Sequence, residues 1–187
     1  MAAFLVTGNP GSGKTTLAEE LSRRGLTAMD SDYVPRLCHY EDGAGNTYSR
    51  AEAPLTSDEE WLSTHRWVWS RARLQEVFKQ HSDPVFICGI ARNIRDVIDL
   101  FDCVFLLRID ADTQEERLRE YDLSSPSSAR NDAGRQQIRA GRSFFEAEML
   151  ELGAMAVDGN ASTTAVADAI LHLLSRYIAP NGDAAGH

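Results

Sequence analysis

The sequence predicts a three-layer α/β fold, in which a parallel β-sheet is covered by helices on both faces. Five apolar runs have the length and composition of strands: Ala3–Val6, Leu26–Met29, Val85–Ile90, Cys103–Ile109 and Ala154–Val157. They are continuously apolar, which is typical of strands buried on both faces of a parallel sheet. Helical patterns separate them, and a glycine-rich loop lies directly between the first strand and the first helix. In such sheets, ligands bind beyond the carboxyl ends of the strands.

The predicted helices carry recognisable terminal signals. They cover Thr15–Arg24, Val34–His39, Asp58–His81, Asn93–Leu100, a segment that ends at Tyr121, Arg135–Leu152 and a C-terminal segment. Asp112 and Glu115 have the spacing of a capping box for the helix that ends at Tyr121. Ser162 or Thr163 is expected to cap the C-terminal helix.

The segments between these elements are expected to be mobile. Glu41–Thr56 and Leu123–Gly134 are polar and lack periodicity, which predicts loops, and Pro180–His187 predicts a disordered tail. The long helix over Asp58–His81 carries three tryptophans (Trp61, Trp67 and Trp69), which are expected to be core or cap residues of that helix. The domain is expected to span residues 1–179, with an acceptor-binding insertion at about 33–82 and a lid at about 122–142.

Length and composition fit one globular domain. The chain has 187 residues, of which 43% are hydrophobic, and a net charge of −9. Without a Lys/Arg-rich run, nucleic acid is not expected as a partner. No apolar run approaches the roughly 20 residues that span a bilayer, and no leader is expected. Cys38, Cys88 and Cys103 lack metal-ligand spacing, which favours reduced thiols and a cytoplasmic location.

The glycine-rich loop has the pattern G-x-x-x-x-G-K-[ST], which is typical of phosphate binding. Its expected nucleotide-binding residues are Gly8, Asn9, Pro10, Gly11, Ser12, Gly13, Lys14, Thr15 and Thr16. Glycines let the main chain curl so that successive N–H groups can surround a polyphosphate, and the helix that begins there favours the same anion. Lys14 would contact the β- and γ-phosphates, and Thr15 would ligate Mg²⁺. The motif therefore predicts ATP and Mg²⁺ as cofactors.

Two acids follow the second predicted strand, at Asp30 and Asp32. Asp32 is our candidate for the base that accepts a proton from the hydroxyl of an acceptor. Asp30 is our candidate for holding Mg²⁺ through water, since Mg²⁺ retains several waters and takes one or two carboxylates. The alternative interpretation is that the pair is a helix N-cap and a solvated turn acid.

Several arginines are expected near the same edge of the sheet. Arg92 follows the third strand and could form a fork for an acceptor phosphate or carboxylate, or for the transferred group; the alternative is an exposed loop arginine. Arg117 lies on the helix after the fourth strand and could bind the nucleotide; the alternative is that it belongs to a solvated helix face. Arg130 and Arg135 could bring positive charge when a loop closes over ATP.

Together these motifs resemble those of the P-loop kinase family of small nucleoside, nucleotide and metabolite kinases. G-N-P-G-S-G-K-T-T and C-G-I-A-R resemble segments of adenylate kinases, whereas D-S-D resembles the D-x-D of shikimate kinases. Q-E-E-R-L-R and the stretch after it resemble the helix and lid over ATP, and V-D-G-N-A-S resembles the loop beside adenine, which implies a role for Asn160. The resemblance implies a five-stranded parallel sheet in the order 2-3-1-4-5. The segment after strand three lacks the glycine triplet of shikimate kinases and the Pro before Arg of adenylate kinases, so the acceptor is not carried over.

The predicted function is an ATP-dependent kinase for a small hydroxyl- or phosphate-bearing metabolite, acting as a monomer or homodimer. The adjacent acids favour a hydroxyl acceptor, while Arg36 and Arg92 keep a nucleotide acceptor open. A GTP switch is disfavoured because the chain lacks an N-K-x-D guanine motif. The remaining alternative is an ATP-binding regulatory module without acceptor-dependent turnover.

Overall fold

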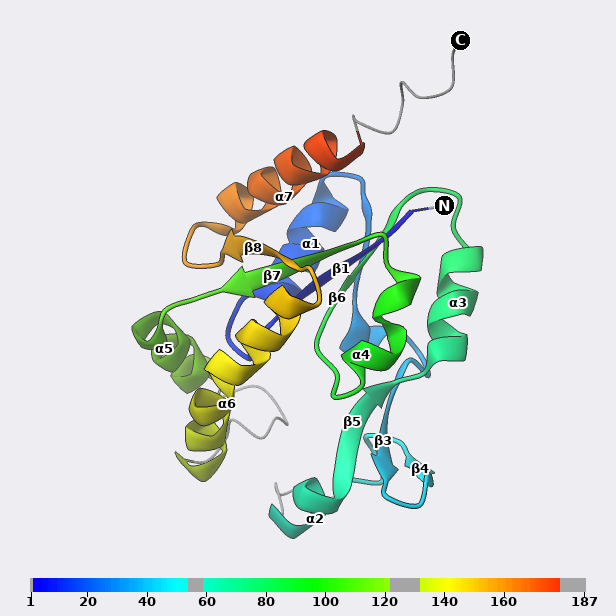
Figure 1. The fold of residues 1–187 in the computed structure, drawn as a ribbon, viewed down its shortest axis with the longest axis vertical. Coiled ribbons are helices and arrows are strands. Elements are labelled where there is room, and N and C mark those ends of the chain that lie inside the picture. The colour runs from blue at the N-terminus through cyan, green and yellow to red at the C-terminus, as the bar shows by residue number, and fades with distance from the viewer. Residues whose placement is uncertain (1, 54–58, 122–131, 179–187) are drawn as a thin grey trace.

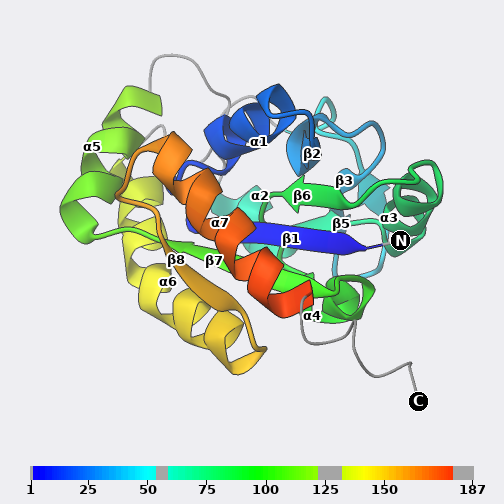
Figure 2. The ribbon, with the colours of Figure 1, turned by 90° about the horizontal axis from the view of Figure 1, so that it is seen from above.

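The structure is a computed structural model, which describes residues 2–53, 59–121 and 132–178. Its centre is an all-parallel sheet of five strands in the order β2-β6-β1-β7-β8 (Figures 1 and 2). The strands are β1 (Ala3–Gly8), β2 (Thr27–Asp30), β6 (Val85–Cys88), β7 (Cys103–Arg108) and β8 (Met155–Asp158). Numbered within this sheet alone, the order is 2-3-1-4-5. The predicted parallel sheet and its strand order are therefore confirmed.

Helices cover both faces of this sheet. They are α1 (Lys14–Arg23), α3 (Arg71–Lys79), α4 (Ile94–Val97) with the 3-10 turn η2 (Ile98–Leu100), α6 (Asp132–Glu151) and α7 (Thr163–Ile178). The helix α5 (Ala111–Tyr121) lies beyond the carboxyl end of β7 (Figure 1). Side chains alternate along β1, so Phe4 and Val6 pack with α1 and α7, whereas Leu5 packs with α3, α4 and α6. The result is two apolar cores, one on each face of the sheet, as three-layer α/β folds require.

The helix ends show which capping predictions hold. Ser162 caps α7, since its Oγ accepts a hydrogen bond from the amide of Ala165 at 3.3 Å. The predicted capping box at Asp112 is wrong, because α5 already begins at Ala111 and Asp112 lies within its first turn. Asp110 caps α5 instead: its Oδ1 accepts from the amide of Thr113 at 2.7 Å. Asp110 directly precedes the first helical residue, the position from which a side-chain oxygen can accept from the free amides of the first turn.

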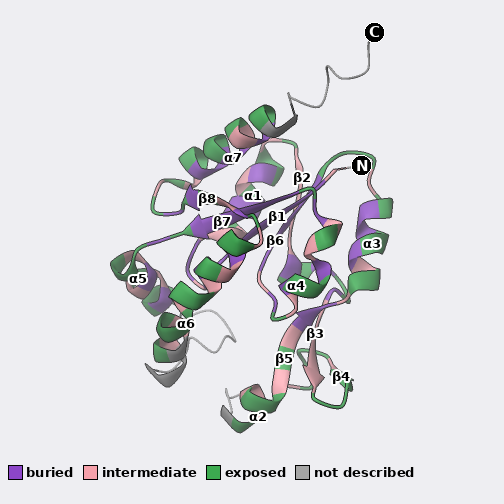
Figure 3. Ribbon diagram, viewed as in Figure 1, coloured by how far each residue is buried: buried purple, intermediate pink, exposed green. Residues whose placement is uncertain are grey.

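A second, antiparallel sheet in the order β4-β3-β5 lies beside the main one, below it in Figure 1. It consists of β3 (Cys38–Asp42), β4 (Thr47–Tyr48) and β5 (His65–Trp69), with the 3-10 turn η1 (Ser31–Tyr33) before it and the helix α2 (Glu59–Thr64) leading into β5. Most of its residues are only half-buried (Figure 3). Part of the predicted loop over Glu41–Thr56 is thus a hairpin.

Two predicted helices in this region are wrong. The segment Asp58–His81 is interrupted by β5, whose run H-R-W-V-W favours a strand through aromatic and β-branched residues. Ser70 then starts α3, because its Oγ accepts from the amide of Arg73 at 3.2 Å. No helix forms over Val34–His39, since Arg36 takes a positive φ of 62° in a turn that leads into β3. The tryptophans of β5 have different surroundings. Trp69 packs in the core that contains Leu5, whereas the Trp67 ring contacts Tyr40 of the small sheet.

The side chain of Asn93 links the small sheet to the main one. The Asn93 amide accepts from the main-chain N–H of Trp69 and donates to its carbonyl, both at 2.9 Å. This pair of bonds fixes the end of β5 against the segment that follows β6, next to the carboxyl edge of the main sheet. Within the described part of the chain, no helix is both long and apolar enough to span a membrane.

Candidate functional site

The glycine-rich loop follows β1 and curls at the carboxyl edge of the main sheet. Gly11 and Gly13 have φ values of 84° and 92°, a left-handed conformation that glycine adopts without steric cost. Gly8 is required by close approach instead, because a Cβ there would lie 2.7 Å from the carbonyl oxygen of Leu107. Gly13 is also the N-cap of α1, and the first amides of a helix have no partner within it. The loop therefore places the first amides of α1 where they can donate to an anion.

The Lys14 side chain folds back over this loop. Its Nζ donates to the carbonyl oxygens of Gly8 at 2.8 Å and of Asn9 at 3.0 Å, and lies 3.4 Å from Ser12 Oγ. Although the residue as a whole is half-exposed, its ammonium lies inside the loop, and burial lowers the pKa of Lys14 to about 8, despite the opposing charge of Asp30. An incoming phosphate would supply the counter-charge that the ammonium lacks.

Thr15 and Asp30 form the second part of the site. Thr15 Oγ1 donates to Asp30 Oδ2 at 2.6 Å, and the other oxygen, Oδ1, accepts from the amide of Asp32 at 2.9 Å. Asp30 is therefore the N-cap of η1, which bears out the capping alternative for this residue, and it also lies against the threonine of the loop. A hydroxyl beside a carboxylate is an oxygen donor set that fits Mg²⁺, which keeps waters and phosphate oxygens as its other ligands. Within the residues described, no three His, Cys, Asp or Glu side chains gather as metal ligands.

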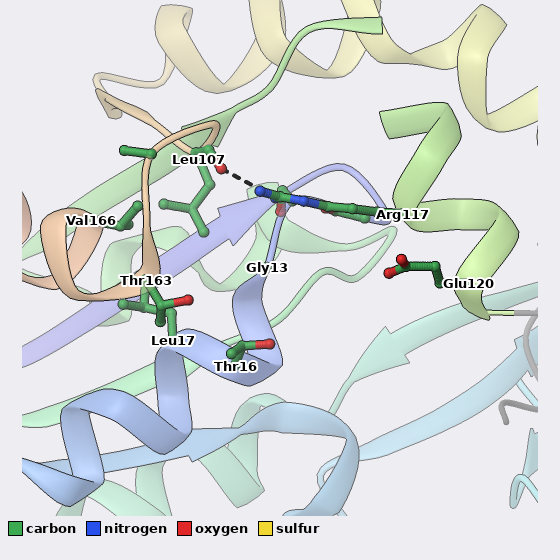
Figure 4. Close-up of a pocket in the computed structure, with 12 residues that line it drawn as sticks. Gly13, Thr16, Leu17, Leu107, Arg117, Glu120, Thr163 and Val166 are labelled. Carbon is green, nitrogen blue, oxygen red and sulfur yellow. Dashed lines mark hydrogen bonds between the residues drawn. The ribbon is translucent and has the colours of Figure 1, made fainter. Parts of the chain in front are cut away.

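A pocket of about 430 Å³ opens beside the loop (Figure 4). Arg117 and Glu120 of α5 lie on one side, and Thr16 and Thr163 from the first turns of α1 and α7 lie on the other. The remaining lining residues are Gly11, Ser12, Gly13, Leu17, Leu107, Gly159, Ala161 and Val166. Arg117 Nη1 donates to the carbonyl oxygens of Gly11 at 3.2 Å and Gly159 at 3.1 Å, and so joins both walls.

Only some of the residues that line this pocket were predicted from the sequence. Arg117 lines it, as predicted, and so do the loop residues Gly11, Ser12, Gly13 and Thr16. Asn160 does not line it: its amide accepts from the main chain of Asp110 at 3.1 Å and donates to Asp158 at 2.9 Å. Thr163 and Val166 were missed, although the segment after β8 was assigned to the base. Glu120 lies one turn beyond Arg117, a spacing that could have pointed to it.

Asp32 lies in η1 and faces the small sheet. Its Oδ2 is 2.9 Å from Arg50 Nη2, and its Oδ1 accepts from Trp67 Nε1 at 3.3 Å. The Arg50 guanidinium also stacks over the Trp67 ring, 4.8 Å from its centroid. The thiol of Cys38 is 3.8 Å from the same carboxylate, and burial together with this negative charge raises the pKa of Cys38 to about 12. Arg50 and Trp67 were missed because they were assigned to a loop and to a helix core.

The other predicted arginines are less closely placed. Arg92 is exposed, and its main-chain N–H donates to the carbonyl of Trp67 at 2.8 Å, so its backbone is fixed at the junction of the two sheets. Arg36 is exposed next to β3. Arg135 lies near the start of α6, and Arg130 lies outside the described residues. The catalytic roles of Arg92, Arg130 and Arg135 stay predictions.

Comparisons with known proteins agree on the fold. The sequence matches no family model, and no curated protein sequence matches it. A gluconokinase from Sinorhizobium meliloti 1021 has a similar structure, with a TM-score of 0.51, 17% identity and coverage of 94% of this chain and 93% of that one. A sugar kinase from Janibacter sp. HTCC2649 is also similar, with a TM-score of 0.53, 19% identity and coverage of 94% of this chain and 95% of that one.

A third similar structure contains a nucleotide. It is a deoxyadenosine kinase from M. mycoides with bound dATP, which has a TM-score of 0.51, 12% identity and coverage of 92% of this chain and 99% of that one. Together with the parallel strand order and the glycine-rich loop, these similarities show that this chain has the fold of the P-loop small-molecule kinases. The predicted fold class and the suspected resemblance are confirmed at this level.

Proposed function

We propose that this protein is an ATP-dependent kinase that transfers the γ-phosphoryl group to a small hydroxyl-bearing metabolite. The observation that carries the proposal is the placement of the Lys14 ammonium and the Thr15–Asp30 pair at one edge of the main sheet, with Asp32 next to them: its amide donates to Asp30, and its negative charge acts on Lys14. Phosphoryl transfer needs little covalent chemistry from the protein, but it needs position and positive charge around the phosphates. The similarity to three kinases of small molecules supports the same activity.

On this proposal the chain has a distinct task for each group. The triphosphate lies in the loop, and Lys14 leaves the carbonyl oxygens of Gly8 and Asn9 to pair with it. The pocket beside Arg117 takes the nucleoside, and its volume of about 430 Å³ lies in the range of known ligand pockets. Thr15 and Asp30 would hold Mg²⁺, which neutralises charge on the phosphates.

The acceptor is proposed to lie between the carboxyl edge of the main sheet and the small sheet. Asp32 would accept the proton of its hydroxyl as the bond to phosphorus forms. The predicted cations Arg92, Arg130 and Arg135 would supply charge to the acceptor or to the transferred group. Asp32 is held by Arg50 and Trp67, so an acceptor would have to share or replace these partners. Two similar structures are named as a gluconokinase and a deoxyadenosine kinase, and both gluconate and deoxyadenosine carry hydroxyl groups, which favours this acceptor class.

The test is ADP release from Mg-ATP in the presence of single candidate acceptors: nucleosides, nucleotides, sugars and sugar acids. The proposal expects at least one of them to stimulate release, with turnover in the range of about 1–100 s⁻¹ typical of kinases. Wild-type protein that binds Mg-ATP tightly but responds to no acceptor would favour a regulatory ATP-binding module instead.

Because three cysteines are free thiols and the proposed cosubstrate is ATP, we propose the cytoplasm as the location of the protein.

A further inference from the structure

Carbonyl oxygens of the phosphate-binding loop accept hydrogen bonds from side chains of two helices, α1 and α5. Lys14 donates to Gly8 and Asn9, and Arg117 donates to Gly11. The carbonyl between them, that of Pro10, accepts from Nε2 of Gln114 at 3.0 Å. Gln114 and Arg117 are one turn apart on α5, so this helix holds two consecutive peptides of the loop.

Gln114 differs from the two charged donors in what it can do when a nucleotide arrives. Lys14 and Arg117 face the loop interior and the pocket, and on the proposed function both would turn toward the ligand. Gln114 is uncharged, only 1% exposed and not among the residues that line the pocket. Its bond to Pro10 can therefore be present both before and after nucleotide binding.

Stability alone does not explain a glutamine at this position. Within the described residues, its second amide atom, Oε1, is buried without a hydrogen-bond partner. A buried polar atom without a partner costs free energy, which offsets what the bond to Pro10 contributes. The helix is also close to the loop, since a Cβ on Gly11 would lie 3.6 Å from the Gln114 carbonyl oxygen.

A second helix holds the loop one residue earlier. Glu146 of α6 is 9% exposed; its Oε2 accepts from Arg108 at 2.9 Å, and its Oε1 lies 3.5 Å from the side-chain amide of Asn9. Asn9 is itself buried. The start of the loop is thus fixed between α5 and α6 by two buried polar side chains.

We infer that Gln114 is a positioning residue for nucleotide binding, which holds the Pro10 peptide so that the amides after it already face the phosphate site. This inference rests on the nucleotide site of the proposed function, but not on the transfer reaction. Fixing a loop in its bound conformation increases affinity because less conformational freedom is lost on binding. Removing the contact should therefore weaken the binding of phosphate while leaving the folded domain intact.

The experiment compares Gln114→Met with wild type and with Gln75→Met, the same substitution at an exposed position of α3. Calorimetry measures the affinity for Mg-ATP and for Mg-tripolyphosphate, which has no base to fill the pocket. We expect Gln114→Met to weaken both by about three- to tenfold, the range for one neutral hydrogen bond. Its melting temperature should stay close to that of wild type, because the lost bond to Pro10 is offset by removal of the unpartnered Oε1. Gln75→Met should bind as wild type does.

An unchanged affinity for both ligands, or a loss of affinity that comes with a lower melting temperature, overturns the assignment. If Gln114→Met does not fold, Gln114→Asn, whose side chain is one methylene shorter, takes its place; because a shortened buried amide lowers the melting temperature by itself, this variant is judged by its affinity for the two ligands alone. The proposed function fails separately: wild-type protein that binds Mg-ATP but releases no ADP with any acceptor contradicts the kinase, and the affinity of Gln114→Met still decides the role of Gln114.

Discussion

The phosphate-binding loop and the small antiparallel sheet are stabilised by different interactions. The loop is fixed by buried polar contacts, such as those of Gln114 and Glu146, and by glycines that allow close approach. The small sheet instead has half-exposed aromatic contacts, such as Tyr40 on Trp67 at 4.7 Å, and a solvent-exposed ion pair between Arg50 and Asp32. Exposed ion pairs contribute about 0–1 kcal/mol each. The proposed nucleotide side is therefore held by buried contacts, whereas the proposed acceptor side can change its contacts at low cost.

The largest expected effect comes from removing the loop ammonium. Lys14→Ala should lower acceptor-dependent turnover by about 10²–10³-fold, the scale for losing one electrostatic stabiliser. Its melting temperature should not fall, because the substitution removes a buried charge whose pKa is already lowered. Initial rates and thermal unfolding measure the two quantities. Wild-type turnover in this variant would show that Lys14 has no role in the reaction. If the variant does not fold, Lys14 is a structural residue instead.

On the acceptor side, Asp32→Asn should slow turnover by about 10²-fold, the lower end of the range for general-base catalysis. The affinity for Mg-ATP should stay within about twofold of wild type, because Asp32 is bonded to the small sheet and the Thr15 hydroxyl is bonded to Asp30. Steady-state kinetics with calorimetry separates the two effects. Equal losses in turnover and in nucleotide affinity would assign Asp32 to the metal site or to the scaffold.

The junction of the two regions can be tested by one added methyl group. At Gly89 a Cβ would lie 2.7 Å from Ser31 Cβ and 2.9 Å from Trp69 Cζ2, and both residues are fully buried. Gly89→Ala should therefore reduce the free energy of unfolding by about 1–3 kcal/mol, the usual cost of overpacking. Gly141→Ala is the control: it lies in α6 with open space around it, and should stabilise by up to about 1 kcal/mol. Denaturant unfolding that ranks the two variants in the opposite order would contradict this packing.

The smallest expected effect is a dependence on pH that is confined to the nucleotide side. Because the pKa of Lys14 in the ligand-free protein is about 8, the ammonium loses its proton above that pH, and the affinity for Mg-ATP should then fall by at most about tenfold per pH unit. Bound phosphate favours the charged form, so binding near pH 8 should take up a proton, which calorimetry in two buffers detects. An affinity that is constant from pH 7 to about 9.5 would show that Lys14 does not pair with the phosphates.

Loss of the Lys14 proton has the opposite effect on folding: it weakens nucleotide binding but increases the stability of the folded protein. Unfolding returns Lys14 to its ordinary pKa of 10.5. The cost of burying its charged form is fully present below pH 8, and it is relieved as the pH rises from about 8 to 10.5. In that window Lys14 therefore makes the nucleotide-free protein more stable as the pH increases.

The nucleotide side could be predicted from sequence because its rules are local. Gly8, Gly11 and Gly13 meet requirements of the main chain itself, and Lys14 and Thr15 follow at fixed spacing between a strand and a helix. The continuous apolar runs likewise predicted the strands, since burial on both faces leaves no polar alternation. Arg117 was found because it lies on the helix that must pass this edge of the sheet.

The acceptor side could not be predicted, because tertiary contacts decide it. Trp67 and Trp69 were assigned to one long helix, but pairing with β3 makes their segment a strand, and the turn at Arg36 leads into β3. Arg50 lies 18 residues from Asp32 in the sequence, and only the hairpin brings them together. Gln114 carries no motif, so its contact with Pro10 is visible only in the structure.

The most direct test of the whole account is a crystal structure with Mg²⁺ and a non-hydrolysable ATP analogue. The account predicts that the phosphates lie inside the loop from Gly8 to Thr15, that Lys14 Nζ has moved from the carbonyl oxygens of Gly8 and Asn9 onto them, and that the base fills the pocket beside Arg117. A nucleotide bound elsewhere, with Lys14 still on those two carbonyl oxygens, would contradict it.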